Sequence, residues 1–179
     1  MPKHHPTRVF DAVMPRYAAE FQCTGSACED TCCSGLKITV DAPTLKAYGG
    51  VTHPQLADRL KRCVTPVPKQ ERRAGGDPAQ LELDPASQCC AFLEQGLCAI
   101  HRDLGEDYLS NTCWSFPRHA RELAGQVEYV LDLGCPEAAR KALLAENALE
   151  LIESPVTLRP VALAKLVPQA GLSPLQVNE

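Results

Sequence analysis

Cysteine is the residue type in this chain best suited to chemistry, and eight of the ten cysteines form a spaced series. The first four fall within eleven residues of one another, and the other four follow singly along the chain. The eight are Cys23, Cys28, Cys32, Cys33, Cys90, Cys98, Cys113 and Cys135. Thiolates are preferred ligands of zinc and of iron–sulfur clusters. Because the first four lie too close together to staple a fold through disulfides, the series predicts a metal centre.

The spacing of these cysteines leaves the kind of metal open. Four thiolates suffice for a structural zinc or for one iron–sulfur cluster, and eight could serve two centres. The side chains of neighbouring residues usually diverge, so we expect Cys32 and Cys33 to serve different ions or sites. Zinc knuckles favour cysteine pairs with a two-residue spacer. The chain has no such pair, which favours iron–sulfur, and we expect Cys63 and Cys89 to be structural thiols.

Composition indicates a soluble globular chain with room for one core. It has 179 residues, of which 45% are hydrophobic and 22% charged, with a formal net charge of -4. The negative charge argues against nucleic acid as a partner, and we expect the basic stretch from Arg59 to Arg73 to be a solvated, flexible segment. No apolar run suggests a signal peptide or a membrane span. The expected location is the cytoplasm, where thiols stay reduced.

The elements that position the first cysteines are predicted to be short. Residues 8–21 have a near-helical apolar spacing interrupted by a proline, which predicts two helical turns before the loop that carries the first cysteines. A strand is predicted over 36–40 and a helix from Asp41 to Tyr48. A second helix is expected over 53–63. The proline-rich residues 64–85 predict a surface loop.

The later cysteines flank two predicted hairpins and a helix. Residues 90–93 and 97–100 read as the arms of a hairpin, which would place Cys90 and Cys98 on neighbouring strands. A second hairpin is expected over 121–133. Cys135 precedes a proline, which predicts an N-cap for a helix over 136–152, and a shorter helix is expected over 161–167.

Together these segments predict an α+β fold. We expect a helix-rich small domain with short β-hairpins organised around a cysteine-ligated metal centre. The predicted cysteine-cluster domain covers residues 1–153, with a flexible loop over about 64–85. Residues 154–179 are expected to form a C-terminal short helix and tail.

Six blocks of the chain, in order, carry a resemblance to a known family. They are residues 21–38, 90–93, 97–101, 104–106, 113–118 and 135–140. In this arrangement the chain resembles the flagellin lysine-N-methylases and the wider zinc- or iron-chelating cysteine-cluster domain over about residues 21–145. Leu36 stands where the family usually has tryptophan.

The resemblance implies methyl transfer from S-adenosylmethionine to lysine side chains of flagellin. It also implies a metal centre, either an iron–sulfur cluster of the 4Fe–4S type or zinc, held by the eight cysteines of the series. Neither a nucleotide-binding glycine loop nor a nucleophilic triad is present, so no catalytic or donor-binding residue is assigned. The expected partner is flagellin, with no nucleic acid and no membrane. The alternative is a non-catalytic module that binds zinc or iron, because the methylases usually continue well beyond the predicted long helix.

Overall fold

A computed structural model describes residues 4–72 and 75–166. The chain forms two compact units, each assembled from separate segments. Unit 1 contains residues 4–5 and 24–114, and unit 2 contains residues 6–23 and 115–166, within the described ranges. The predicted domain boundaries, 1–153 and 154–179, stay a prediction, and residue 153 lies inside a strand of unit 2.

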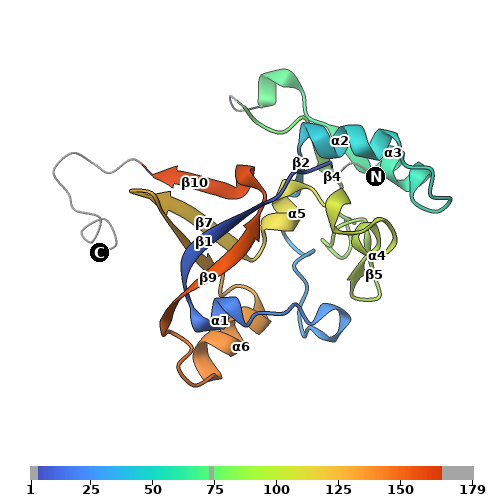
Figure 1. The fold of residues 1–179 in the computed structure, drawn as a ribbon. Helices are drawn as coiled ribbons and strands as arrows, with labels where there is room; N and C mark the ends of the chain where they lie inside the picture. The colour runs from blue at the N-terminus through green and yellow to red at the C-terminus, as the bar shows by residue number, and fades with distance from the viewer. Residues whose placement is uncertain (1–3, 73–74, 167–179) are drawn as a thin grey trace. The chain divides into compact units, whose positions relative to one another are not determined.

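Unit 2 is built on a five-stranded sheet with the order β10-β7-β8-β1-β9 (Figure 1). Its strands are β1 (Arg8–Pro15), β7 (Arg118–Leu123), β8 (Gln126–Leu131), β9 (Leu151–Leu158) and β10 (Leu163–Leu166). β1 pairs antiparallel with β9 along its whole length, from Arg8 opposite Leu158 to Pro15 opposite Leu151. On its other side β1 runs parallel to β8. The sheet therefore joins the beginning of the chain to its later part.

The helical turns expected before Pro15 are wrong, because residues 8–15 form β1. Ala12 and Met14 alternate with more exposed residues and are each 2% exposed, so they point to the same face of the strand. A helical turn does follow, as α1 (Arg16–Ala19). The hydroxyl of Tyr17 in α1 donates a hydrogen bond of 3.1 Å to the carbonyl of Leu131, which ties α1 to the end of β8.

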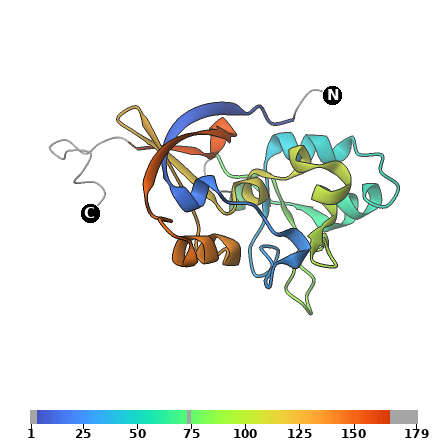
Figure 2. The same cartoon turned by 60° about the horizontal axis from the view of Figure 1, so that its bottom comes forward.

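Helix α6 (Pro136–Leu144) begins as predicted but ends eight residues early. Asn147 takes a left-handed conformation with φ 55°, and β9 follows from Leu151. Asparagine tolerates this conformation better than most residues, so it turns the chain toward the sheet. α1 and α6 lie side by side (Figure 2).

The helix expected over 161–167 is also wrong for its described part. Residues 160–166 form the short 3-10 helix η4 (Pro160–Ala162) and then β10, and Val167 lies outside the described residues. The hairpin expected over 121–133 is confirmed as β7 and β8, with Ala124 and Gly125 at its turn. Both turn residues have positive φ, as a two-residue turn between twisted strands requires. The peptide bond between Phe116 and Pro117 is cis.

Unit 1 is made of short helices and strands around one apolar core. Its α-helices are α2 (Ala42–Gly49), α3 (Ala57–Cys63), α4 (Ala99–Leu104) and α5 (Asn111–Ser115), the last ending at the unit boundary. Its 3-10 helices are η1 (Gly25–Ala27), η2 (Lys69–Glu71) and η3 (Glu106–Tyr108). Its strands are β2 (Thr39–Val40), β3 (Val64–Pro66), β4 (Ala79–Leu81), β5 (Leu93–Glu94) and β6 (Leu97–Cys98).

The surface loop predicted over 64–85 is only partly correct. β3 and β4 lie within it and form a three-stranded sheet with β2, in the order β2-β4-β3. Ala79 and Leu81 are buried at 0% and 6% exposure in the same core as Phe92 and Leu60. This stretch therefore supplies part of the core of unit 1.

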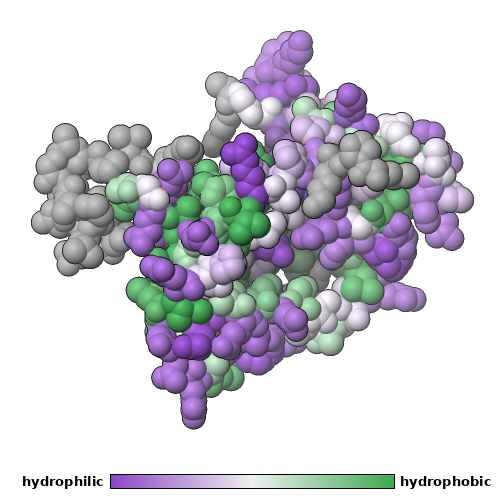
Figure 3. All heavy atoms as spheres, viewed as in Figure 1, coloured by the Kyte–Doolittle hydropathy of each residue, from purple (hydrophilic) through white to green (hydrophobic). Residues whose placement is uncertain are grey.

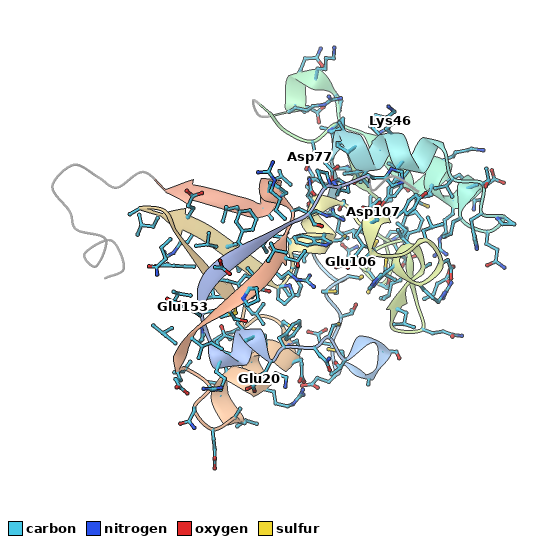
Figure 4. The ribbon with its side chains drawn as sticks, viewed as in Figure 1. Glu20, Lys46, Asp77, Glu106, Asp107 and Glu153 are labelled. Carbon is cyan, nitrogen blue, oxygen red and sulfur yellow. The ribbon has the colours of Figure 1, made fainter. Side chains whose placement is uncertain are left out.

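The start of the described chain is held on unit 1 by carboxylates. Asp107, labelled in Figure 4, accepts hydrogen bonds from the amides of His4 at 2.7 Å and His5 at 3.2 Å. The buried His5 ring lies 2.8 Å from the hydroxyl of Thr44, which also donates to Asp41. These contacts hold residues 4–5 on unit 1, although unit 2 begins at residue 6.

The mixed α+β class is confirmed, but the helices are shorter than predicted. The longest α-helix of the described part, α6, has nine residues. Apolar side chains also remain on the surface of unit 2, with Leu143, Leu144 and Leu149 each more than 70% exposed, and Figure 3 shows hydrophobic atoms at the surface of this unit. Across the described ranges, no helix combines the length and the apolar character needed to cross a bilayer.

Candidate metal centre

The segments that carry Cys33 and Cys90 are paired directly through their backbones. The amide of Cys90 donates a hydrogen bond of 2.7 Å to the carbonyl of Cys33, and the amide of Gly35 donates to Gln88 at 3.1 Å. An isolated antiparallel bridge joins Ser34 to Cys89 between these bonds. Two cysteine segments separated by more than fifty residues of sequence thus lie side by side.

Cys98 is positioned by a hairpin and the helix that follows it. β5 and β6 pair with Leu93 opposite Cys98, and α4 begins at the next residue, so Cys98 is the N-cap. The predicted hairpin is therefore confirmed around residues 93–98. Cys90 is not on its facing strand, because it forms an isolated bridge to Leu83 instead.

Cys113 is positioned by helix α5. Its amide donates to the hydroxyl of the buried Ser110 at 3.4 Å. The same helix is joined to α2, because the amide of Asn111 donates to Asp41 at 2.8 Å. A packed scaffold therefore sets the place of Cys113.

Five thiols of unit 1 each interact electrostatically with at least three of the others, and they come from four segments of the chain. They are Cys32, Cys33, Cys90, Cys98 and Cys113, here called the thiol cluster. Burial, together with neighbouring thiols, raises the pKa of Cys90 to about 11 and that of Cys113 to about 12. Without a cation these thiols favour their neutral form, because burial and like charge both penalise thiolates.

Cys32 differs from the rest of the thiol cluster. A hydrogen bond from the Cys33 thiol lowers the pKa of Cys32 to about 6, and the same bond raises the pKa of Cys33. The two thiols therefore influence each other, and whether they serve different ions stays a prediction. The backbone of the two residues is set by local contacts, in which the Cys33 amide donates to the Thr31 hydroxyl at 3.1 Å.

Two arginines that the sequence alone does not identify, Arg59 and Arg102, act on the thiol cluster. Arg59 opposes the burial-driven rise in the pKa of Cys90, and Arg102 does the same for Cys98. The prediction that Arg59 belongs to a solvated segment is wrong, because its side chain is only 25% exposed on α3. No sequence motif marks either arginine, since each acts through tertiary contacts.

The remaining cysteines have different surroundings. Cys28 directly follows η1 in unit 1, and Cys63 packs against the core and interacts electrostatically with Cys90. Cys89 donates through its thiol to the carbonyl of Ser87 at 3.5 Å. Cys23 and Cys135 belong to unit 2, where Cys135 is the N-cap of α6 as predicted.

The donor chemistry of the thiol cluster fits a thiophilic metal. Over residues 4–72 and 75–166, no group of three or more His, Cys, Asp or Glu side chains has the arrangement of a metal site. Cys90 is buried, Cys33, Cys98 and Cys113 are partly buried, and Cys32 is exposed. Thiolates at these positions would repel one another, and a bound cation relieves such repulsion. Zinc and iron–sulfur clusters are the groups that all-thiolate sites select.

The chain is similar in sequence to lysine-N-methylases and to a flagellar biosynthetic protein, all of them from Salmonella. It is 32% identical over 155 residues to the lysine-N-methylase of Salmonella typhimurium, a match that covers 86% of this chain and 38% of that protein. The lysine-N-methylase of Salmonella choleraesuis matches to the same extent. The flagellar biosynthetic protein FliU of Salmonella muenchen is 33% identical over 140 residues, covering 78% of this chain and 80% of FliU. No family model and no solved structure matches the chain.

The match to FliU, with 33% identity over 80% of its length, shows which family the chain belongs to. The chain belongs to the family of the lysine-N-methylases and the flagellar biosynthetic protein FliU. It spans 38% of the length of the lysine-N-methylases that it matches.

Proposed function

We propose that this chain acts in the cytoplasm as a protein-lysine N-methyltransferase that modifies flagellin and takes its methyl group from S-adenosylmethionine. The activity is supported by the relatives named lysine-N-methylase, and the flagellar substrate by the relative named FliU. The similarity extends over most of this chain and therefore includes the segments that build the thiol cluster.

We further propose that the thiol cluster holds an iron–sulfur cluster, of the 4Fe–4S type, or zinc. The observation that carries this proposal is the gathering of five thiols from four separate segments in one unit. Cys28 of unit 1 is a further proposed ligand, and Cys23 and Cys135 of unit 2 stay predicted metal ligands. When bound, such a group would neutralise the thiolates and cross-link the segments that carry them.

A non-catalytic metal-binding module is the second candidate. It is favoured by the chemistry of the thiol cluster, because thiolates from several segments also suit a metal that only holds the fold together.

Methyl transfer to flagellin separates the two candidates. Protein purified without oxygen would be incubated with labelled S-adenosylmethionine and unmethylated flagellin, with Cys113→Ala as the test variant and Cys89→Ala as its matched control. The methyltransferase predicts label on flagellin lysines with wild type and Cys89→Ala, and a strong loss with Cys113→Ala. No transfer by wild-type protein with a fully loaded centre would instead support the module.

A further inference from the structure

Arg59 makes three kinds of contact with one segment of unit 1. Its Nε and Nη2 atoms both donate to the carbonyl of Ala91, with the Nε bond at 2.9 Å. Its Nη1 atom pairs with the carboxylate of Glu94. Its guanidinium carbon lies 5.3 Å from the ring centroid of Phe92, the geometry of a cation–π contact. A single side chain from α3 thus contacts Ala91, Phe92 and Glu94, which lie within four positions of the chain.

The segment that Arg59 contacts lies between Cys90 and Cys98 in the sequence. Ala91 directly follows Cys90, and Phe92 is fully buried and accepts a hydrogen bond of 2.9 Å from Ala99. Glu94 lies in β5, whose partner strand ends at Cys98. Fixing Ala91 and Glu94 therefore constrains the backbone beside both cysteines.

A second arginine, Arg102, links β5 to α4 through hydrogen bonds. Arg102 donates to Glu94 at 3.0 Å and to both carboxylate oxygens of Asp103 at 2.7 Å. Because α4 begins directly after Cys98, that cysteine lies between two elements joined through Glu94.

These contacts differ from an ordinary surface ion pair. An exposed pair contributes little, because solvent screens it and its side chains lose freedom. Here the guanidinium uses its planar fork on a backbone carbonyl and its face on a buried aromatic ring. Lysine has neither the fork nor the planar face, so it cannot replace this set of contacts.

We propose that Arg59 is a positioning residue for the thiol cluster: it fixes the backbone beside Cys90 and Cys98 and so sets the positions of the two thiols. The part of this inference that concerns metal rests on the proposed function, and the part that concerns the positions of the two thiols does not.

The test compares Arg59→Gln and Arg59→Lys with the control Arg62→Gln. Arg62 is exposed on the same helix, so the control removes the same charge from α3. Glu94→Gln is the milder variant, because it leaves both bonds to Ala91 in place, and it keeps the test usable if Arg59→Gln does not fold. Circular dichroism establishes that each variant is folded.

The first readout is the alkylation rate of each cysteine in metal-free, reduced protein, followed by mass spectrometry. We expect Arg59→Gln to speed alkylation at Cys90 and Cys98 severalfold, because the loosened segment exposes both thiols, and to leave Cys135 of unit 2 unchanged. Loss of the Arg59 charge by itself would slow the reaction of Cys90, so a faster rate there reports the change in position. Glu94→Gln is expected to show a smaller change in the same direction. Rates at Cys90 and Cys98 equal to those of Arg62→Gln would overturn the inference.

The second readout is cobalt(II) binding, followed through the thiolate-to-cobalt absorption band. Residues that orient metal ligands typically change affinity by about 10–100-fold, so we expect about tenfold weaker binding in Arg59→Gln, with partial rescue in Arg59→Lys. Equal binding by wild type and all Arg59 variants would contradict the inference. If wild type bound no cobalt, the metal proposal would fail, and the alkylation rates would still decide whether Arg59 positions the two thiols.

Discussion

The amide of Cys90 donates a hydrogen bond of 2.7 Å to the carbonyl of Cys33. This bond joins the early cysteines of the chain to the later ones inside one unit. The thiols on either side of it interact electrostatically, as do those of Cys98 and Cys113. Backbone hydrogen bonding therefore holds the segments of Cys33 and Cys90 side by side.

Cys32 should be the most reactive thiol of the cluster in metal-free protein near neutral pH. The Cys33 thiol lowers the pKa of Cys32 to about 6, so Cys32 is largely thiolate at pH 7, whereas burial raises the pKa of Cys113 to about 12. Alkylation at Cys32 should increase as the pH rises through about 6 and then level off. Cys33→Ala should move this transition upward, while Cys63→Ala should not. An unchanged profile in Cys33→Ala would contradict the assignment.

Asp41 should stabilise unit 1 through several hydrogen bonds at once. It caps α2 by accepting from the Thr44 amide at 3.0 Å, and it accepts from the Asn111 amide at 2.8 Å. Since Asp41 is 5% exposed, Asp41→Ala leaves buried donors without partners and should cost about 2–3 kcal/mol in the free energy of unfolding. Urea denaturation measures this cost. The exposed Asp58→Ala on α3 is the control, and an equal effect of both variants would contradict the prediction.

The same carboxylate predicts a loss of stability in acid. Burial alone would raise the pKa of Asp41, but hydrogen bonds from Thr44 and Asn111 prevail and lower it. A group with a lowered folded-state pKa contributes its full stability above its ordinary pKa and loses it as the pH falls through the folded value. Wild-type stability should therefore fall below about pH 4 more steeply than that of Asp41→Ala. Parallel pH profiles of the two proteins would contradict this assignment.

Tyr17 should stabilise unit 2 independently of any metal. Its hydroxyl donates to the Leu131 carbonyl at 3.1 Å and accepts from the Leu131 amide at 3.4 Å. Tyr17→Phe keeps the ring and removes both bonds, which should cost about 1–2 kcal/mol in the free energy of unfolding. Metal content should not change in this variant. A drop in metal content without a drop in stability would show that the variant acts in some other way.

Metal loading should protect unit 1 selectively from hydrogen exchange. A bound metal stabilises the state that binds it and cross-links its ligand segments. Exchange should slow around Cys33, Cys90 and Cys113, while β1 and β9 exchange as before. Hydrogen exchange with mass spectrometry on loaded and metal-free protein measures this difference. Uniform protection of both units would contradict a centre confined to the thiol cluster.

Features set by local chemistry could be predicted from the sequence. Asp41 caps α2, Cys135 precedes a helix, and the hairpin turn at Ala124 and Gly125 lies where a glycine suggests it. In each case the decisive contacts lie within a few residues of one another. Short-range preferences are enough to specify such elements.

Features set by distant contacts could not be predicted. β1 has an apolar spacing that suits a helix, yet pairing with β9, more than 130 residues later, makes it a strand. The same pairing ends α6 at Leu144, because residues 151–152 of the predicted helix form the start of β9 instead. Local propensity is weak compared with the burial and hydrogen bonds that such pairing brings. Cys90 and Cys98 are predicted on facing strands, but only Cys98 lies in the hairpin, opposite Leu93, while Cys90 forms a bridge to Leu83.

The most direct test of the thiol cluster as a metal centre is the metal and sulfide content of protein purified without oxygen, together with its visible absorption spectrum. We predict at least one bound centre per chain, with iron and sulfide or with zinc, lost in Cys32→Ala and Cys113→Ala and kept in Cys89→Ala. Wild-type protein without stoichiometric metal, or equal metal content in all three variants, would contradict the account.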